Sequence, residues 1–238
     1  MKNLKITKKD LDKDNYYIGK EDFSEYSKRY NGNIEIEGYL GTVRFKKGIH
    51  TMYSIVAQTG SCISAGEGIS AGWGISAGEG ISAGRGISAG RGISAGWGIS
   101  AGEGISAGEG ISAGSGISAG WGISAGEGIS AGRGISAGSG ISAGCGISAG
   151  RRISAGWGIS AKLEISAGLN IFAGVSKNID AQGDYKKITC SRLVKGTVCY
   201  GDLVETGQEI NLSGKEVSVE IDGKKFTAII KHLHRHHE

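Results

Sequence analysis

Few side chains in this sequence have the type and spacing that catalysis requires, and the main enzymatic candidate is His50. A histidine can act as a general base near neutral pH, and His50 precedes a long repeat (residues 63–176) that contains no histidine. Serines recur throughout this repeat, but a hydroxyl without a nearby base is a poor nucleophile. Cys145 also lies in the repeat and lacks such a base. We therefore predict no catalytic residue, with His50 a solvent-facing or cap histidine.

Histidines also gather near residue 238, where metal binding is the chemistry to consider. The cluster consists of His232, His234, His236 and His237. Their spacing matches no fixed ligand pattern, and no second shell of carboxylates supports them. We predict a polar tail over residues 232–238, with no metal site, no cofactor and no small-molecule substrate.

The cysteines and the bulk composition indicate a cytoplasmic protein. The chain has 238 residues and a net charge of +4, which is too mild to dictate a partner. Its first residues lack the cationic and then apolar pattern of a signal segment, and no apolar run has membrane-spanning length. The four cysteines form no CxxC pair: Cys62, Cys145, Cys190 and Cys199. Reduced thiols are expected in the cytosol, and a bridge between Cys190 and Cys199 across a hairpin is the alternative.

Tryptophan and arginine side chains within the repeat are the better candidates for function. The candidate binding residues are Trp73, Trp97, Trp121, Trp157, Arg85 and Arg133. Each tryptophan stands between two glycines, and exposed tryptophans are enriched at binding hot spots. The alternative is that these rings lie over their neighbours and stabilise the edge, or are copies of one duplicated block.

The element that positions these residues is a hexad, I-S-A-G-x-G, whose isoleucine returns every sixth residue from Ile63 to Ile171. In an extended chain neighbouring side chains point to opposite sides, so isoleucine and alanine point inward and serine points outward. Strict alternation would also bury the variable fifth residue, which is often charged and cannot be buried unpaired. The chain must therefore turn at G-x-G, where glycine permits unusual backbone angles. We predict a parallel β-solenoid whose fifth residue projects from each corner.

The number of sides per coil follows from how many hexads close one turn. Three hexads give an eighteen-residue, three-sided coil, which we favour, and two hexads give a twelve-residue, two-sided coil. All four tryptophans are separated by multiples of twelve residues. A two-sided coil would place them on one edge, whereas a three-sided coil would spread them over three edges, with Trp121 and Trp157 sharing one.

The aliphatic residue at every sixth position resembles the pattern of hexapeptide-repeat left-handed β-helices. That resemblance implies three hexads per triangular coil and, for many members, acyltransferase activity with a histidine base. This chain has alanine two residues after isoleucine where the family places a small residue four after it. A second resemblance concerns NIEIEGYLGTVRF, the repeat, IFAG and GTVCYGDL at 196–203. Together these look like uncharacterised bacterial and bacteriophage proteins, which implies an origin in a mobile element and a bacterial host cell.

Composition changes along the chain divide it into four parts. Residues 1–33 form a polar leader or cap, with a short helix expected over 20–30. Residues 34–184 form the solenoid, in which 34–62 are eroded coils. Residues 185–231 are expected to form a small antiparallel β-strand region, with a type I′ hairpin at Asp222-Gly223.

Function can be predicted only by class. We expect a non-enzymatic interaction protein whose rigid solenoid presents corner residues to a protein partner. Given the bacteriophage resemblance, host machinery such as an antiviral (CRISPR-type) defence complex is a candidate partner. The alternative is a self-assembling solenoid that oligomerises through a tryptophan edge or the C-terminal sheet. Nucleic-acid binding is disfavoured because glutamates alternate with the arginines.

Overall fold

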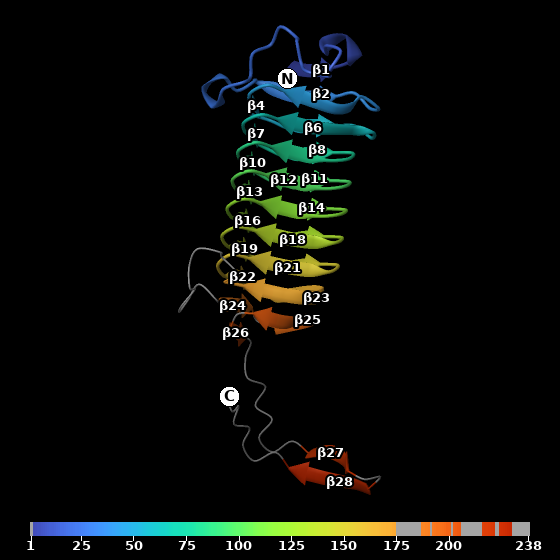
Figure 1. The fold of residues 1–238 in the computed structure, drawn as a ribbon, viewed down its shortest axis with the longest axis vertical. Coiled ribbons are helices and arrows are strands. Elements are labelled where there is room, and N and C mark those ends of the chain that lie inside the picture. Colours follow the sequence, from blue (N-terminus) through green and yellow to red (C-terminus); the bar gives the residue numbers. More distant parts are fainter. Residues whose placement is uncertain are drawn as a thin grey trace. The chain divides into compact units, whose positions relative to one another are not determined.

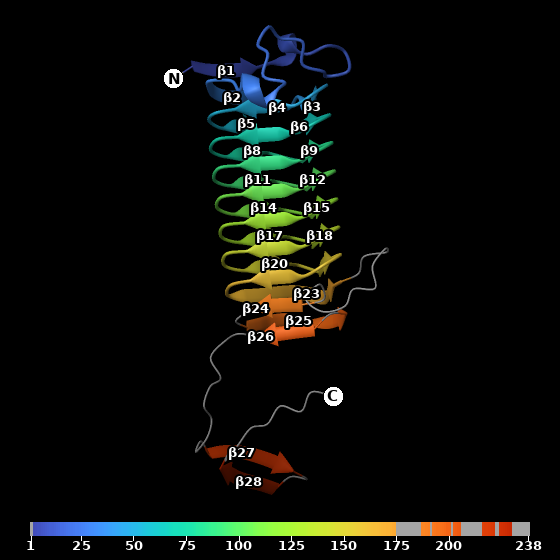
Figure 2. The ribbon, with the colours of Figure 1, turned by 90° about the vertical axis from the view of Figure 1, so that its left-hand side faces the viewer.

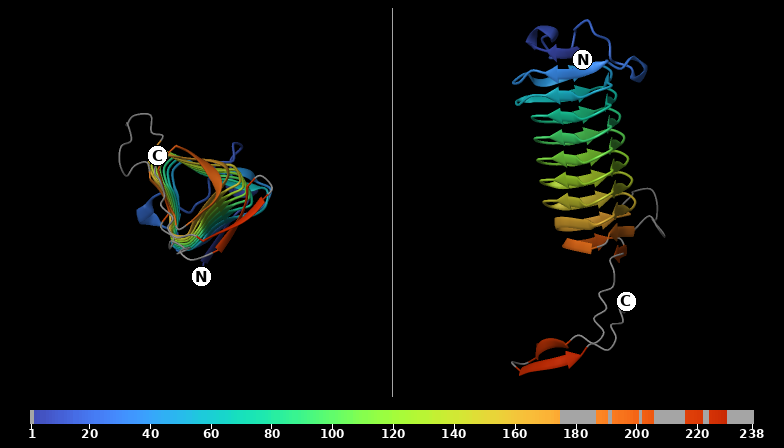
Figure 3. Two further views of the ribbon diagram at one scale, coloured as in Figure 1. Left: turned by 90° about the horizontal axis from the view of Figure 1, so that it is seen from below. Right: turned by 180° about the vertical axis from the view of Figure 1, so that it is seen from behind.

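The first of two compact units in this protein is a parallel β-solenoid. The computed structural model describes residues 2–174, 187–190, 192–200, 202–205, 216–221 and 224–229. Residues up to Thr206 form the first unit and those from Gly207 the second. Seen along its axis, the first unit is a triangular coil (Figure 3), and from the side its strands stack in successive rungs (Figure 1).

Three faces, numbered here 1 to 3, make up the coil, and strands stack in parallel on each. Face 1 contains β4 (Ile49–Thr51), β7 (Ile69–Ala71), β10 (Ile87–Ala89), β13 (Ile105–Ala107), β16 (Ile123–Ala125), β19 (Ile141–Ala143), β22 (Ile159–Ala161), β24 (Lys187–Cys190) and β26 (Asp202–Glu205). Face 2 contains β1 (Lys2–Ile6), β2 (Gly32–Ile36), β5 (Ile55–Ala57), β8 (Ile75–Ala77), β11 (Ile93–Ala95), β14 (Ile111–Ala113), β17 (Ile129–Ala131) and β20 (Ile147–Ala149). Face 3 contains β3 (Gly41–Phe45), β6 (Ser61–Ala65), β9 (Ile81–Ala83), β12 (Ile99–Ala101), β15 (Ile117–Ala119), β18 (Gly134–Ala137) and β21 (Arg152–Ala155). The long strands β23 (Glu164–Ala173) and β25 (Arg192–Tyr200) complete faces 2 and 3.

Strand register fixes the coil at eighteen residues in the regular repeat. Ile87 pairs with Ile105 on one side and with Ile69 on the other, a step of eighteen residues each way. Serine pairs with serine and alanine with alanine in the same steps. The three-sided expectation is therefore confirmed, and the twelve-residue alternative is wrong.

The alternation predicted from the hexad is also confirmed. The isoleucines and alanines of the repeat are buried, whereas the serines between them face outward on the three flat faces. Each isoleucine thus stacks on the isoleucine of the next coil inside the triangle. Burying one such side chain contributes about 1.5–3 kcal/mol, and the ladder repeats this gain at every rung.

The corner glycines serve a different purpose from the one expected. Among the described residues, the glycines with positive φ are Gly41, Gly60, Gly174 and Gly196, and none lies at a corner between residues 63 and 170. The first glycine of G-x-G is required by close stacking instead: a Cβ on Gly84 would lie 2.1 Å from the carbonyl oxygen of Gly66. The second glycine has more room, since a Cβ on Gly86 would lie 3.3 Å from the oxygen of Gly104.

Sequence variation follows this difference between the two glycines. Arg152, Glu164 and Asn170 replace the second glycine of their hexads, whereas Lys162 is the one replacement of the first between residues 63 and 170. The coil geometry therefore tolerates a side chain at the second position far better than at the first.

At the N-terminal end, the eroded coils continue the same three faces with longer turns. Ile34 pairs with Ile55 on face 2, and Val43 pairs with Ile63 on face 3. Strand β1 adds one further rung on β2, and the segment that follows β1 lies over the end of the coil (Figure 2). The helix expected over 20–30 is reduced to a single 3₁₀ turn, Tyr26–Lys28, after an earlier one at Lys8–Asp10. Phe23 and Tyr30 are buried against the coil instead of forming a helical stripe.

At the C-terminal end, parallel coiling continues further than the sequence indicated. Strands β24 and β26 pair in parallel on face 1, and β25 pairs in parallel with β23. The antiparallel region expected from residue 185 is thus confined to the second unit, where β27 (Glu216–Ile221) and β28 (Lys224–Ile229) form a hairpin. Residues 206–215 of the expected β-strand region, the two turn residues of the hairpin and the 232–238 tail lie outside the described residues.

Candidate functional site

The fifth residue of each hexad forms one of three columns along the edges of the triangle. Backbone bonds from each corner amide to the corner carbonyl of the preceding coil define these columns. Edge A consists of Trp73, Arg91, Glu109, Glu127, Cys145 and Leu163. Edge B consists of Glu79, Trp97, Ser115, Arg133, Arg151 and Leu169. Edge C consists of Glu67, Arg85, Glu103, Trp121, Ser139 and Trp157.

The four tryptophans do not share one edge. Trp73 lies on edge A, Trp97 on edge B, and Trp121 and Trp157 on edge C, two coils apart. This is the distribution expected for an eighteen-residue coil. The possibility that all four tryptophans form one edge, through which copies of the chain would assemble, is therefore wrong.

Trp73 stabilises its own edge. Its ring packs against that of Tyr53, with centroids 5.6 Å apart at an angle of 60°. On the other side, the guanidinium of Arg91 lies 5.0 Å from the ring centroid and reaches Glu109 at 4.0 Å. A ring packed between two neighbours stabilises its own edge and is less free to bind another molecule. Trp73 is therefore a poor candidate for a binding anchor.

Trp97 and Trp121 are placed differently. Their side chains are 65% and 64% exposed, against 46% for Trp73 and 42% for Trp157. Within the described part of the chain, the structure gives these two rings no aromatic or cationic contact. Tryptophan is enriched at the hot spots of protein interfaces, and a ring without an internal partner can pack on another molecule at no internal cost. Of the four tryptophans predicted to bind a partner, Trp97 and Trp121 are the two best placed to do so.

The two predicted arginines differ in their surroundings. Arg85 lies on edge C between Glu67 and Glu103, so its charge is offset by neighbours of opposite sign. Arg133 lies on edge B between Ser115 and Arg151, and no ion pair forms at either arginine within the described residues. Edge B thus presents two successive cations below an exposed tryptophan, and the exposed Leu169 follows them.

His50, predicted to be a solvent-facing or cap histidine, is covered by the N-terminal segment and does not face solvent. It stands on β4 at the position of the outward serines, in register with Ser70, but its side chain is only 8% exposed. The Tyr26 ring meets the imidazole edge-on at 5.8 Å, and the Arg29 guanidinium lies 3.4 Å from the centroid of the same tyrosine. The Nδ1 atom of His50 is buried without a hydrogen-bond partner. Burial, helped by the nearby Arg29 charge and opposed by Glu67, lowers the pKa of His50.

The thiols show no catalytic arrangement. Cys145 is exposed on edge A, and its column neighbours are Glu127 and Leu163, so no histidine adjoins it in its column. Cys190 is buried on face 1 and Cys199 is exposed on β25, and no disulfide joins them, so the alternative bridge is wrong. Burial raises the pKa of the Cys190 thiol. In the part of the chain that is described, no three His, Cys, Asp or Glu side chains gather as metal ligands.

Each flat face of the triangle is also a shallow groove, which the sequence analysis did not identify. The grooves on faces 1, 2 and 3 have volumes of about 890, 940 and 640 Å³. Glycine and serine of successive rungs line all three. The outward-facing serines of the hexad were a sequence signal for a polar line along each face. Only the strand register shows which serines share a face.

Comparison with known protein families, with curated proteins and with solved structures finds no match for this chain. The parallel β-solenoid with eighteen-residue coils therefore rests on the sequence periodicity and the strand register. No helix in the described residues is long and apolar enough to span a membrane.

Proposed function

We propose that this protein is a non-enzymatic recognition scaffold that binds an acidic protein partner through edge B. The observation that carries the proposal is the column itself: exposed Trp97, then Ser115, Arg133 and Arg151, then exposed Leu169. Coils lie about 4.8 Å apart, so these five side chains form a straight strip roughly 19 Å long. Tryptophan and arginine, two of the residue types most enriched at interface hot spots, thus lie together on one rigid strip.

The rigidity of the scaffold supports recognition as the function. Each corner amide is bonded to the preceding coil, so corner side chains keep fixed spacing before a partner arrives. Preorganisation of this kind reduces the entropy lost on binding. Edge B has one glutamate, Glu79, which lies three coils before Arg133, and the glutamates of edges A and C are separated from edge B by whole faces. Positive charge is therefore local to Arg133 and Arg151 on a molecule of modest net charge.

The partner itself follows from the sequence resemblance alone. The resemblance to bacterial and bacteriophage proteins makes host machinery, including an antiviral defence complex, the first set of partners to test. Acidic surfaces on such proteins would complement Arg133 and Arg151 and would bind more weakly at high salt.

The test is a quantitative pull-down from bacterial host lysate with matched edge variants. Trp97→Ser and the charge reversal Arg133→Glu with Arg151→Glu should each abolish capture of the same protein. Arg85→Glu on edge C, an equally exposed corner, should leave capture unchanged. Equal loss in all variants, or capture of nucleic acid alone, would contradict the proposal. Light scattering on the same samples distinguishes self-association, which would appear as a mass that rises with concentration.

A further inference from the structure

The groove on face 1 differs from the other two in its lining. Its floor consists of glycine, isoleucine and serine of successive rungs, so that a line of serine hydroxyls runs beside an apolar strip and ends at Thr189, and Trp121 forms part of its wall. The lining includes no charged side chain, whereas Glu127 and Glu164 line the face 2 groove and Arg152 lines the face 3 groove. Face 1 is thus an uncharged groove with aromatic residues, of which Tyr26 stands at the N-terminal end.

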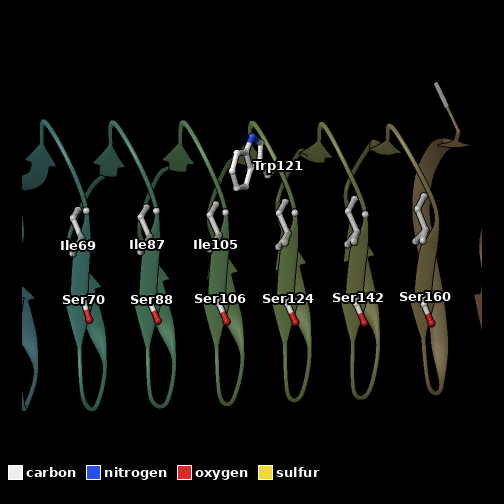
Figure 4. Close-up of a pocket in the computed structure, with 18 of the residues that line it drawn as sticks. Ile69, Ser70, Ile87, Ser88, Ile105, Ser106, Trp121, Ser124, Ser142 and Ser160 are labelled. Carbon is white, nitrogen blue, oxygen red and sulfur yellow. The ribbon is translucent and has the colours of Figure 1, made fainter. Parts of the chain in front are cut away.

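The hydroxyls of this floor are oriented alike and unused within the protein. Figure 4 shows Ser70, Ser88, Ser106, Ser124, Ser142 and Ser160 in one line with their oxygens pointing the same way. Within the described residues, the structure gives these hydroxyls no hydrogen-bond partner. Each one can both donate and accept. A floor of this kind suits a ligand that presents hydroxyl groups at regular intervals.

Trp121 supplies an apolar surface beside this floor. In Figure 4 its ring leans from edge C over face 1, between the rungs of Ser106 and Ser124. The faces of an indole attract C–H groups that carry slight positive charge, as well as other rings. The ring has no aromatic or cationic partner of its own within the described residues, so stacking on a ligand would not displace an internal contact.

The N-terminal end of the groove is closed by the segment that carries Tyr26. The His50 side chain there is only 8% exposed, and its Nδ1 atom is buried beneath this segment, so a ligand in the open groove does not reach it. Ser70 on the neighbouring rung is also buried. The accessible floor therefore begins at Ser88 and runs to Thr189.

We propose that the face 1 groove binds a neutral, linear polysaccharide, whose sugar rings stack on Trp121 and whose hydroxyls bond to the serine ladder. An extended peptide fits less well, because it needs free backbone groups on a strand edge, and the face 1 strands from β7 to β24 pair on both sides. A nucleic acid or acidic glycan would need cations, which are missing from this lining. The site is separate from edge B and does not depend on the function proposed above.

The experiment measures binding of four neutral hexasaccharides (cellohexaose, maltohexaose, mannohexaose and chitohexaose) to the full chain by calorimetry and tryptophan fluorescence. At least one should bind with a fluorescence change. Trp121→Ala should weaken that binding at least about tenfold, since one stacked ring contributes about a factor of ten. Trp97→Ala, an equally exposed ring on edge B, should not weaken it.

A second pair of variants tests the floor. The double change Ser106→Val with Ser124→Val should weaken binding by a similar factor, while Ser100→Val with Ser118→Val on face 3 should leave it intact. Valine is tolerated at this position, because Val56 already occupies it on β5. Failure of all four sugars to bind, equal loss in the face 3 control, or stronger binding of an acidic hexasaccharide would overturn the proposal.

Discussion

At the scale of single residues, the hexad constrains every position except the fifth. Isoleucine and alanine fill the interior, serine faces solvent, and the first glycine lets one coil stack on the next. The fifth side chain projects outward from its corner and does not enter the core, so its identity can vary without loss of the fold. Trp73 has contacts of this kind and Trp97 has none within the described residues.

This contrast predicts different stabilities for two tryptophan variants. Trp73→Ala removes a ring pair and a cation–π contact and should lower the free energy of unfolding by about 1–2 kcal/mol. Trp97→Ala should change it by less than about 0.5 kcal/mol. Urea unfolding followed by circular dichroism checks both values. Equal destabilisation by the two variants would mean that Trp97, like Trp73, makes contacts that stabilise its edge.

The two glycines of one corner give a sharper residue-scale prediction. A Cβ on Gly102 would lie 2.0 Å from the oxygen of Gly84, but one on Gly104 would lie 3.4 Å from that of Gly122. Gly102→Ala should therefore destabilise the protein by about 1–3 kcal/mol or more through overpacking. Gly104→Ala should cost well under that amount. Thermal melts of the two variants show whether the corner needs glycine for close stacking or for backbone flexibility. If flexibility were the reason, both substitutions would lower the melting temperature alike.

At the scale of elements, the regular strands and their inward faces could be predicted from the sequence because identical rungs repeat the same signal. The ends could not, because erosion removes the period there. The segment 187–205 contains Gly196 and few isoleucines, and its pairing with β22 and β23 is set by contact with the preceding coil. The burial of His50 depends likewise on Phe23 and Tyr30, which the chain brings over β4 from another segment.

His50 gives the N-terminal cap a predicted pH dependence. The groups facing the imidazole are Tyr26, Arg29 and Glu67. Because burial and Arg29 lower its pKa, the folded cap resists protonation more than the unfolded chain does. The cap should be fully stable above the unfolded pKa of about 6.5 and should lose stability as the pH falls below it.

Hydrogen exchange of the amides of residues 23–30, measured between pH 7.5 and 5, tests this dependence after correction for intrinsic rates. Protection should fall toward pH 5 in the native protein and much less in His50→Gln, which cannot gain a proton. Glu67→Gln removes the opposing charge and lowers the folded pKa further, so the fall should begin at the same pH but continue to a lower pH, with a larger total loss of protection. An identical pH profile for the native protein and His50→Gln would show that other groups control the cap.

At the scale of the whole molecule, the coil period decides which side chains meet. Eighteen residues per turn places Trp97, Arg133 and Arg151 in one column, and it gathers Ser88, Ser106 and Ser124 on one face. A different period would scatter both groups. The strip on edge B and the groove on face 1 therefore depend on the same geometric fact.

The most direct measurement of that fact is chemical cross-linking from the natural thiol Cys145. In a chain with Cys62 and Cys199 changed to serine, Glu127→Cys places a second thiol eighteen residues before Cys145, and Arg133→Cys places one twelve residues before it. Each protein is treated with dibromobimane, a short reagent that links neighbouring thiols, and the products are mapped by mass spectrometry. We predict an efficient link for Glu127→Cys and none for Arg133→Cys. A link from Arg133→Cys, with none from Glu127→Cys, would contradict the three-sided coil and both sites proposed on it.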